Sequence, residues 1–248
     1  MSKGELNNVN DSDIFDTMKV YSVDFGLTDF GSLWQIQKEI NLFKQKNKCP
    51  DLLIFTEHKN VYTLGRGGDR NHLLIGKDEM HREGIDYFEI DRGGDLTYHG
   101  PGQIVCYPIF DLNNYYSDTH KYLRDLEEVI IRTLKSYGID SGRDEQYTGV
   151  WVNGEKICSI GIKVSRWITM HGLAFNVNNE LSYFEKIIPC GIFHKSMTSM
   201  KNLLGKEQDM GEVRQRVTES FENVFGTAIE PIHKDEVAEY FPAAIPSF

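Results

Sequence analysis

The chain has 248 residues and a formal net charge of −10, with 40% hydrophobic and 12% aromatic residues. This length supports one large domain with a substantial core, and the composition excludes an intrinsically disordered chain. The net negative charge argues against general affinity for nucleic acids. No apolar run is long enough to cross a bilayer, and the first residues lack the apolar core of a signal peptide. We therefore expect a cytoplasmic protein.

The start of the chain predicts a flexible segment followed by a helix. Residues 1–17 are polar and are expected to form a flexible N-terminal segment, before a single domain over residues 18–248. From Leu33 onward, apolar side chains recur at helical spacing, which predicts a helix over residues 31–45.

Four strands are expected next. Runs rich in β-branched and aromatic residues, bounded by glycine or polar residues, predict them over residues 51–57, 60–65, 85–91 and 103–112. Pro108 lies in the last of these and indicates an edge strand or a bulge, because proline cannot donate a hydrogen bond to a strand ladder.

The second half of the chain alternates helices and strands. The clearest helix covers residues 117–138, with Ser117 or Asp118 as its cap and Gly138 as its stop. Asn153-Gly154 is a favoured two-residue turn, which predicts a hairpin over residues 148–164. A strand over residues 168–177, a short helix over 181–187 and a final helix over 209–226 follow. Because no repeat period appears, the expected fold class is α/β (α+β), a mixed β-sheet flanked by helices in one domain.

The segment "RGGDLTYHGPGQ" (92–103) is the first candidate for a functional site. It matches neither the P-loop pattern nor the dinucleotide-binding glycine pattern. Four glycines in twelve positions would let backbone N–H groups approach a ligand, with Arg92, His99 and Gln103 as polar partners. A tight hairpin with a surface arginine is the structural alternative.

The four cysteines are far apart in the sequence, without a CxxC pair, and are expected to be reduced. Cys106 and Cys158 lie in apolar strands and are interpreted as buried residues. Cys49 does not lie in a predicted strand. Cys190 stands between a proline and a glycine in an expected loop, which favours an exposed thiol held in a stiff turn.

Other polar residues permit several interpretations. Lys156 follows the predicted turn, where a lysine usually faces solvent. His171 and His194 form no compact ligand set, so no metal site is predicted. Cys190 with His99 or His171 would also suit a cysteine hydrolase. Residues 195–206 contain three lysines and no acidic residue. This pattern is typical either of a local basic patch or of a solvent-exposed loop followed by the first turn of a helix.

Together these segments resemble the lipoyl(octanoyl) transferase family. The resemblance is carried by "EHKNVYTLGRGG", "RGGDLTYHGPGQIVCYPIFDL", "GVWVNGEKICSIGIKV", "HGLAFNV" and "IPCGI", in the family's order over roughly residues 20–225. It implies the fold of biotin and lipoate protein ligases. It also implies octanoyl transfer from acyl carrier protein to a lysine of a lipoyl domain, such as the glycine cleavage H protein or a 2-oxoacid dehydrogenase E2 subunit, without ATP, metal or another cofactor.

The resemblance also implies roles for residues. Cys190 matches the acyl-thioester nucleophile, and Lys156 the lysine that lowers the pKa of that thiol. The residues matching the substrate-binding segments are Arg92, Gly93, Gly94, Asp95, Leu96, Thr97, Tyr98, His99, Ser159, Ile160, Gly161, Gly172, Leu173 and Ala174. Asp95 stands where the family usually has glutamine, and Met200 where leucine is common. If buried, Asp95 would raise the pKa of a nearby thiol.

The chemistry explains these residue types. A thiol with a pKa of ~8.5 is mostly protonated at neutral pH, and an adjacent ammonium favours its nucleophilic thiolate. Neutral Lys156 would then remove a proton from the acceptor amine. We expect Gly93 and Gly94 to admit the acyl chain, whose burial stabilises binding by at most ~5 kcal/mol, and amides near Gly161 or Gly172 to face the thioester oxygen.

Three other functions remain open at this point. An ATP-dependent lipoate or biotin ligase on the same fold would adenylate a free acid and need no cysteine. A lipoyl-domain binding module would show no turnover. A cysteine hydrolase would release free octanoate even when an acceptor domain is present.

Overall fold

The computed structural model describes residues 19–188 and 196–242. Its strands are β1 (Val20–Thr28), β2 (Asp51–His58), β3 (Val61–Leu64), β4 (Asp86–Glu89), β5 (Leu96–His99), β6 (Gln103–Ile109), β7 (Val150–Val152), β8 (Glu155–Ser165), β9 (Ile168–Asn176) and β10 (Ile229–Pro231). Its helices are α2 (Phe30–Lys44), α3 (Lys77–Arg82), α4 (Thr119–Ser136), α5 (Met200–Leu204), α6 (Met210–Phe225) and α7 (Val237–Tyr240).

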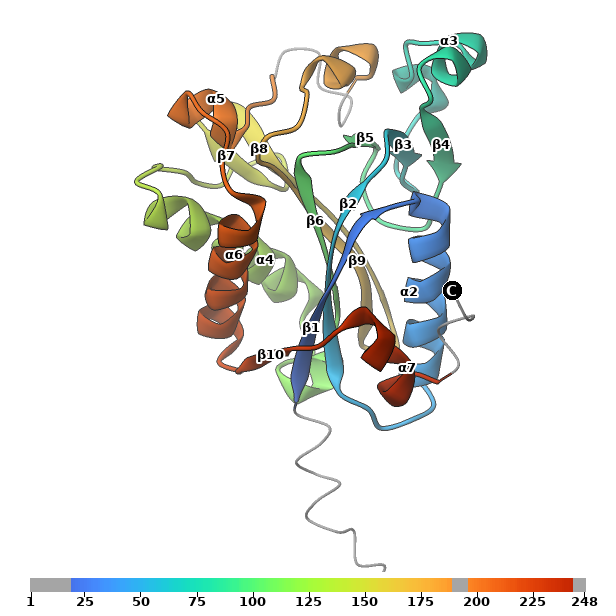
Figure 1. The fold of residues 1–248 in the computed structure, drawn as a ribbon, viewed down its shortest axis with the longest axis vertical. Coiled ribbons are helices and arrows are strands. Elements are labelled where there is room, and N and C mark those ends of the chain that lie inside the picture. Colours follow the sequence, from blue (N-terminus) through green and yellow to red (C-terminus); the bar gives the residue numbers. More distant parts are fainter. Residues whose placement is uncertain (1–18, 189–195, 243–248) are drawn as a thin grey trace, which may run out of the picture.

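A seven-stranded sheet with the order β10-β1-β2-β6-β9-β8-β7 forms the centre of the molecule. β1 pairs in parallel with β10 and β2, and the other neighbours pair antiparallel, so the sheet is mixed. Helices α4 and α6 cover one face of the sheet, and α2 and α7 cover the other (Figure 1). One apolar cluster lies between the sheet and each pair of helices. The expected fold class is confirmed.

The predicted helices begin and end where their capping residues stand. The Asp29 carboxylate accepts the Ser32 N–H at the start of α2, and the Asp118 carboxylate accepts two N–H groups at the start of α4. Gly138 follows α4 with a φ of 73°, the left-handed conformation expected of a helix stop. The predicted hairpin is confirmed, because Asn153 and Gly154 have φ values of 50° and 84° between β7 and β8.

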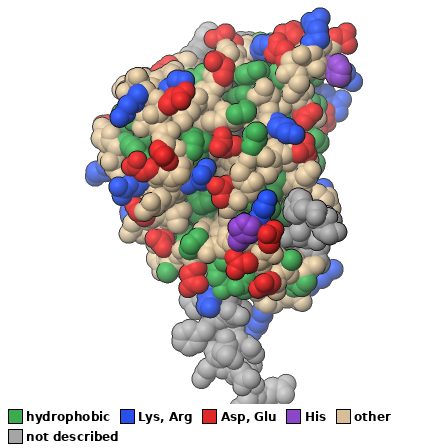
Figure 2. Space-filling view, viewed as in Figure 1, with side chains coloured by type: hydrophobic (Ala, Val, Ile, Leu, Met, Phe, Trp, Pro, Cys, Tyr) green, Lys and Arg blue, Asp and Glu red, His purple; other side chains and the backbone are tan. Residues whose placement is uncertain are grey.

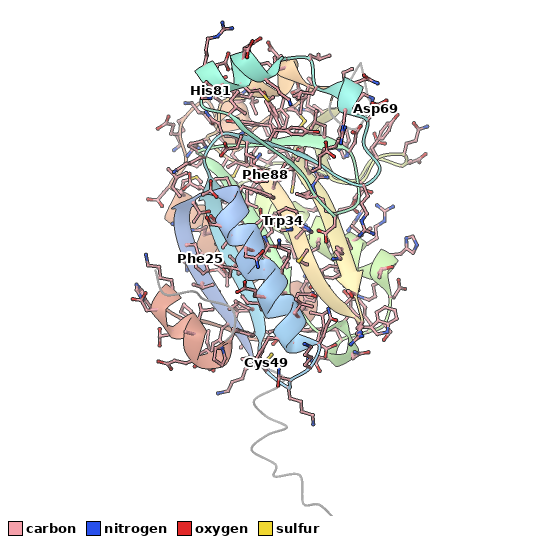
Figure 3. The ribbon with its side chains drawn as sticks, turned by 90° about the vertical axis from the view of Figure 1, so that its right-hand side faces the viewer. Phe25, Trp34, Cys49, Asp69, His81 and Phe88 are labelled. Carbon is pink, nitrogen blue, oxygen red and sulfur yellow. The ribbon has the colours of Figure 1, made fainter. Side chains whose placement is uncertain are left out.

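Two features were not predicted from the sequence: β1, and a second, three-stranded sheet with the order β4-β3-β5. β5 lies inside the glycine-rich segment (residues 92–103), where Leu96–His99 pairs antiparallel with β3. This small sheet lies over the start of α2, and Figure 3 shows Phe88 of β4 near Trp34 of that helix. Phe30 of α2 contacts both rings, at centroid distances of 5.3 Å to Phe88 and 6.1 Å to Trp34.

The sequence left two interpretations of Pro108 open, an edge strand or a bulge; the edge strand is wrong, and the β2–β6 register shows no shift at Pro108. β6 lies inside the large sheet between β2 and β9, and Pro108 pairs with Leu53. The Pro108 carbonyl accepts the Thr169 hydroxyl at 2.7 Å, so the polar side of its backbone faces β9. The β6–β9 ladder ends at Cys106–Leu173, and the missing proline N–H therefore falls where no ladder bond is made.

Other expectations concern burial and surface. Cys106 and Cys158 are fully buried, as expected, and burial raises the pKa of both thiols. On the face shown in Figure 2, acidic and basic side chains are interspersed. None of the helices within the described ranges is long and apolar enough to cross a membrane. The expected flexible segment, residues 1–17, lies outside the described residues, and the domain boundary stays a prediction.

A buried ion pair joins the end of α2 to the start of β2. The Lys44 Nζ and Asp51 Oδ1 atoms are 2.9 Å apart, and both side chains are at most 2% exposed. Asp51 also accepts the Asp111 N–H and the Tyr115 hydroxyl, and Lys44 donates to the Pro50 carbonyl. The pair is therefore fully hydrogen-bonded, which a buried charge requires.

Asp51→Asn should lower the free energy of unfolding by about 3 kcal/mol or more, because it leaves the Lys44 ammonium buried without its counter-charge. Urea unfolding followed by circular dichroism measures this change. Glu207→Gln is the control, since it breaks the exposed Lys201–Glu207 pair and should leave the urea midpoint almost unchanged. Equal effects of the two substitutions would contradict this account of the buried pair.

Candidate active site

A cavity of about 370 Å³ lies where β6, β8 and β9 meet the glycine-rich segment. Most of the residues singled out from the sequence line it together: Arg92, Gly93, Gly94, Asp95, Leu96, Thr97, His99, Lys156, Ser159, Ile160, Gly161, Gly172, Leu173 and Ala174. They come from three separate segments of the sequence, residues 92–99, 156–161 and 172–174. The fold therefore brings the predicted segments into one site.

A β-bulge turns the Lys156 side chain into the cavity. Trp151 of β7 pairs with Lys156, but the next residue, Val150, pairs with Cys158, so Ile157 is the extra residue of β8. A bulge shifts the alternation of side chains between the two faces of a strand. Lys156 lines the same cavity as Ser159 and Gly161, although residue spacing alone would place it opposite them.

The Lys156 side chain is only 4% exposed, contrary to the usual solvent-facing position of a lysine after a turn. Its Nζ lies 4.8 Å from the centroid of the Trp151 ring, a cation–π contact. Its methylenes pass beside Gly149, where a Cβ atom would lie 3.3 Å from the Lys156 Cε. Gly149 is held by its N–H bond to the buried Glu127 carboxylate.

Arg92 fixes the glycine-rich segment to its neighbours. One guanidinium nitrogen donates to the Thr63 carbonyl at 2.7 Å and the Thr63 hydroxyl at 3.0 Å. The Gly93 N–H donates to the Ile162 carbonyl of β8 at 2.9 Å. A Cβ atom at Gly161 would lie 2.9 Å from the Arg92 Cδ, so glycine is needed for the arginine to cross this strand.

The glycines serve backbone packing as well as the cavity. A Cβ atom at Gly65 would lie 2.3 Å from the Gly94 carbonyl oxygen, because the turn after β3 packs directly against the glycine-rich segment. At Gly172 it would lie 2.2 Å from the Cys106 carbonyl oxygen. In contrast, at Gly93 it would meet only the Ile162 oxygen, at 3.6 Å, so this position leaves room beside the cavity.

Two members of the predicted segment make other contacts. Tyr98 donates its hydroxyl to Asn60 and stacks on Tyr183 at 4.8 Å, within the apolar cluster under the small sheet. Asp95 lines the cavity but pairs with His72 at 2.5 Å and accepts the Leu96 and Asp69 N–H groups. Its carboxylate thus holds the turn at residues 69–72.

The rings of Phe30, His99 and Tyr107 line one part of the cavity, and the His58 ring packs against all three. His99 stacks on Phe30 at a centroid distance of 6.1 Å, and His58 bonds to the Tyr107 hydroxyl at 2.8 Å. Burial lowers the pKa of His99 to about 3 and that of His58 to about 4. Both imidazoles are therefore uncharged at neutral pH, which suits an apolar ligand.

His171 lines the cavity, although the sequence suggested for it only metal or hydrolase chemistry. It has a φ of 61° within β9, an uncommon conformation for a residue other than glycine. Its Nε2 donates to Asp91 Oδ1 at 2.9 Å, and its N–H donates to the buried Gln37 side chain. The hydrogen bonds from His171 and Lys163 lower the pKa of the Asp91 carboxyl, so this side chain is charged.

Several cavity residues carried no signal in the sequence. These are Phe30, Ile90, Val105, Tyr107, Leu123, Gln146, Tyr147, Thr148, Trp151, Ile162, Ser196 and Met197. They come from the strands of the large sheet, from α2 and α4, and from the segments after β4, before β7 and before α5. Apolar spacing marks most of them as core residues, and nothing in a single sequence separates core from cavity wall.

Cys190 and His194 lie outside the described residues. The described chain ends at Ile188, whose N–H donates to the His72 carbonyl, and resumes at Ser196, whose carbonyl accepts the Lys156 N–H at 3.0 Å. Among residues 19–188 and 196–242, no group of three or more His, Cys, Asp or Glu side chains could hold a metal ion.

Comparisons with known proteins agree on the kind of protein that this chain resembles. The family model described as the lipoyl protein ligase A/B catalytic domain matches residues 31–222. An octanoyltransferase from Flavobacterium johnsoniae is 45% identical over 228 residues, covering 85% of this chain and 98% of the relative. One from Rubrobacter xylanophilus is 46% identical over 203 residues, covering 81% and 91%.

Solved structures share the fold at low identity. A lipoate-protein ligase A bound with ATP has a TM-score of 0.71 at 14% identity, covering 92% of both chains. A bipartite lipoate protein ligase from Thermoplasma acidophilum has a TM-score of 0.70 at 13% identity, covering 93% of this chain and 99% of that one.

The buried histidines predict acid sensitivity. His58 and His99 have folded-state pKa values of about 4 and about 3, below the ordinary ~6.5. Between the folded-state pKa and ~6.5, the unfolded state therefore binds more protons than the folded state. The contribution of these histidines to the free energy of unfolding is fully present above pH ~6.5. It falls as the pH decreases, by up to ~1.4 kcal/mol per pH unit for each histidine. Urea midpoints at pH 7, 6 and 5 measure this slope.

His58→Gln should make that slope clearly shallower, because one of the buried histidines that gain a proton on unfolding is removed, while His99 and His171 remain. His120→Gln is the control, since His120 is exposed on α4 and its removal should leave the slope unchanged. A wild-type urea midpoint that is constant between pH 7 and pH 5 would contradict the neutral state of these rings.

Proposed function

Because this chain belongs to the lipoyl protein ligase A/B catalytic-domain family and transfers octanoyl groups, as its curated octanoyltransferase relatives indicate, we propose that Cys190 and Lys156 carry out the transfer. The position of Lys156 supports this assignment most directly. Its buried ammonium stands on the wall of the cavity, and its N–H bonds to Ser196, six positions after Cys190 in the sequence.

In the first step, the Cys190 thiolate attacks the carbonyl carbon of an octanoyl thioester. A bond forms between this carbon and the Cys190 sulfur, and the bond to the donor sulfur breaks. The departing thiolate takes a proton from the Lys156 ammonium, which leaves Lys156 neutral. The product is an octanoyl thioester on the enzyme.

In the second step, the acceptor lysine attacks this thioester as a free amine, after losing one proton to solvent. Neutral Lys156 removes a second proton as the amide bond forms, and the Cys190 thiolate departs. The ion pair of thiolate and ammonium is thereby restored. Thioester and amine give the more stable amide, so the sequence of steps needs no ATP.

The cavity wall suits an octanoyl chain. Phe30, Ile90, Val105, Leu173 and Ala174 supply apolar surface, and the nearby histidines are uncharged. Burying seven carbons beyond the carbonyl stabilises binding by at most ~5 kcal/mol. This placement supports the proposed substrate-binding roles of residues 92–99, 159–161 and 172–174, except that we propose for Tyr98 a role in holding the segment in place.

The family acts with an acyl donor and lipoyl-domain acceptors. For this chain we infer octanoyl-acyl carrier protein as the donor, and the glycine cleavage H protein and 2-oxoacid dehydrogenase E2 subunits as acceptors. The amides that stabilise the thioester oxygen are expected near Gly161 or Gly172. The cytoplasm stays the predicted compartment.

Cys190→Ser should abolish the acyl-enzyme. Incubation with octanoyl-acyl carrier protein adds one octanoyl group to the wild type, visible by intact mass and lost on addition of a lipoyl domain, whereas the variant gains none. Cys49→Ser is the matched control and should acylate normally. An ATP-dependent ligase would keep its activity in Cys190→Ser, and that outcome would refute the proposed nucleophile.

Lys156→Ala should lower kcat for octanoyl transfer by at least ~100-fold, because it removes both the partner of the thiolate and the base. The pH at which the enzyme acylates fastest should also rise toward the ordinary thiol pKa of ~8.5. Single-turnover acylation from pH 6 to 10 measures both effects. Lys201→Ala, on the surface of α5, should behave as wild type; a Lys156→Ala variant with near-normal rates would exclude this role.

A further inference from the structure

A chain of buried polar groups connects the glycine-rich segment to the main chain of Lys156. His99 Nδ1 bonds to Gln103 Oε1 at 2.8 Å, and Gln103 Nε2 donates to Asn176 Oδ1 at 2.9 Å. Asn176 Nδ2 donates to the Thr198 carbonyl at 3.1 Å, and the Thr198 N–H donates to the Lys156 carbonyl at 3.0 Å. All five residues are at most 6% exposed.

The direction of each bond in this chain is fixed. Gln103 Nε2 also donates to the Tyr98 carbonyl, and Asn176 Nδ2 donates to the Thr198 carbonyl. A main-chain carbonyl can only accept, so neither amide can turn over without leaving buried groups unpaired. His99 must then donate from Nδ1 to Gln103. Such a chain has one stable arrangement.

Asn176 stands where the regular sheet ends beside Lys156. The β8–β9 ladder ends at Cys158–Phe175, so β9 no longer neighbours the main chain of Lys156. Residues 196–198 take its place: Ser196 accepts the Lys156 N–H, and Met197 forms a parallel bridge with Lys156. Asn176, the last residue of β9, bonds directly to this segment.

Building on the proposed function, we propose that Asn176 is a positioning residue for octanoyl transfer. It holds residues 196–198 against the Lys156 main chain and so fixes how the lysine side chain enters the cavity. Lys156 lies next to a bulge, where the ladder to β7 is irregular, so its direction depends on this second neighbour. Ser196 and Met197 line the same cavity.

Asn176→Ala and Asn178→Ala form a matched pair for the test. Asn178 lies two residues after Asn176 and also connects to a later segment, away from Lys156. Its Nδ2 donates to the Gln208 carbonyl at 2.8 Å, and its Oδ1 accepts the Gln208 N–H at 2.9 Å. The measurements are kcat and KM for octanoyl transfer, and the rate of Cys190 alkylation by iodoacetamide from pH 6 to 10, mapped by peptide mass.

Asn176→Ala should lower kcat by about tenfold with KM within about threefold, since transition-state alignment is lost while the cavity remains. Its alkylation profile should move to higher pH. Asn178→Ala should match the wild type in both measurements. A purely structural role for Asn176 would lower the thermal midpoint without moving the alkylation profile.

Lys156→Ala distinguishes failure of this inference from failure of the proposed function. If Lys156→Ala leaves the alkylation profile unmoved, the pairing of Lys156 with Cys190 is wrong. If Lys156→Ala moves the profile but Asn176→Ala does not, the positioning role is overturned. Should Asn176→Ala fail to fold, Gln103→Ala removes the preceding link of the chain and should shift the profile in the same direction; an unchanged profile there would also overturn the inference.

Discussion

The geometry of the site depends on where one buried ammonium is held. Lys156 is 4% exposed beside an apolar cavity, and a charged group in such a place is costly unless its surroundings fix and compensate it. The extra residue in β8 directs the side chain inward, the Trp151 ring lies over the ammonium, and residues 196–198 hold the main chain. Three separate parts of the fold therefore act on one side chain.

Close approach of main chains is the second constraint, and it accounts for the glycines. The turn after β3, the glycine-rich segment and β8 approach each other within contacts that a Cβ atom would forbid at Gly65 and Gly161. Arg92 occupies the space that this packing leaves and bonds to the Thr63 main chain. The cavity is thus the gap that remains between tightly packed backbones, which gives it a rigid wall.

The polar groups around the cavity are buried but paired. His58, His99 and His171 are neutral because burial lowers their pKa values, and each is hydrogen-bonded to a neighbour. This arrangement reconciles an apolar ligand with polar neighbours, because the three histidines are uncharged and their hydrogen-bonding groups are paired. The charged side chains that line the cavity are Arg92, Asp95 and Lys156, and the partly exposed Asp91–Lys163 pair adjoins His171.

The mixed sheet, the major helices and the hairpin turn could be predicted from local patterns in the sequence, and the family resemblance supplied the set of segments that make the site. Capping residues, turn residues and hydrophobic period act over a few positions, so a single sequence reveals them. Three features could not be predicted in this way: Pro108 lies in a central strand, His171 is a left-handed cavity residue, and Lys156 points inward next to a bulge. Each of these depends on pairing between strands distant in the sequence, and no local pattern encodes which main-chain groups will face one another.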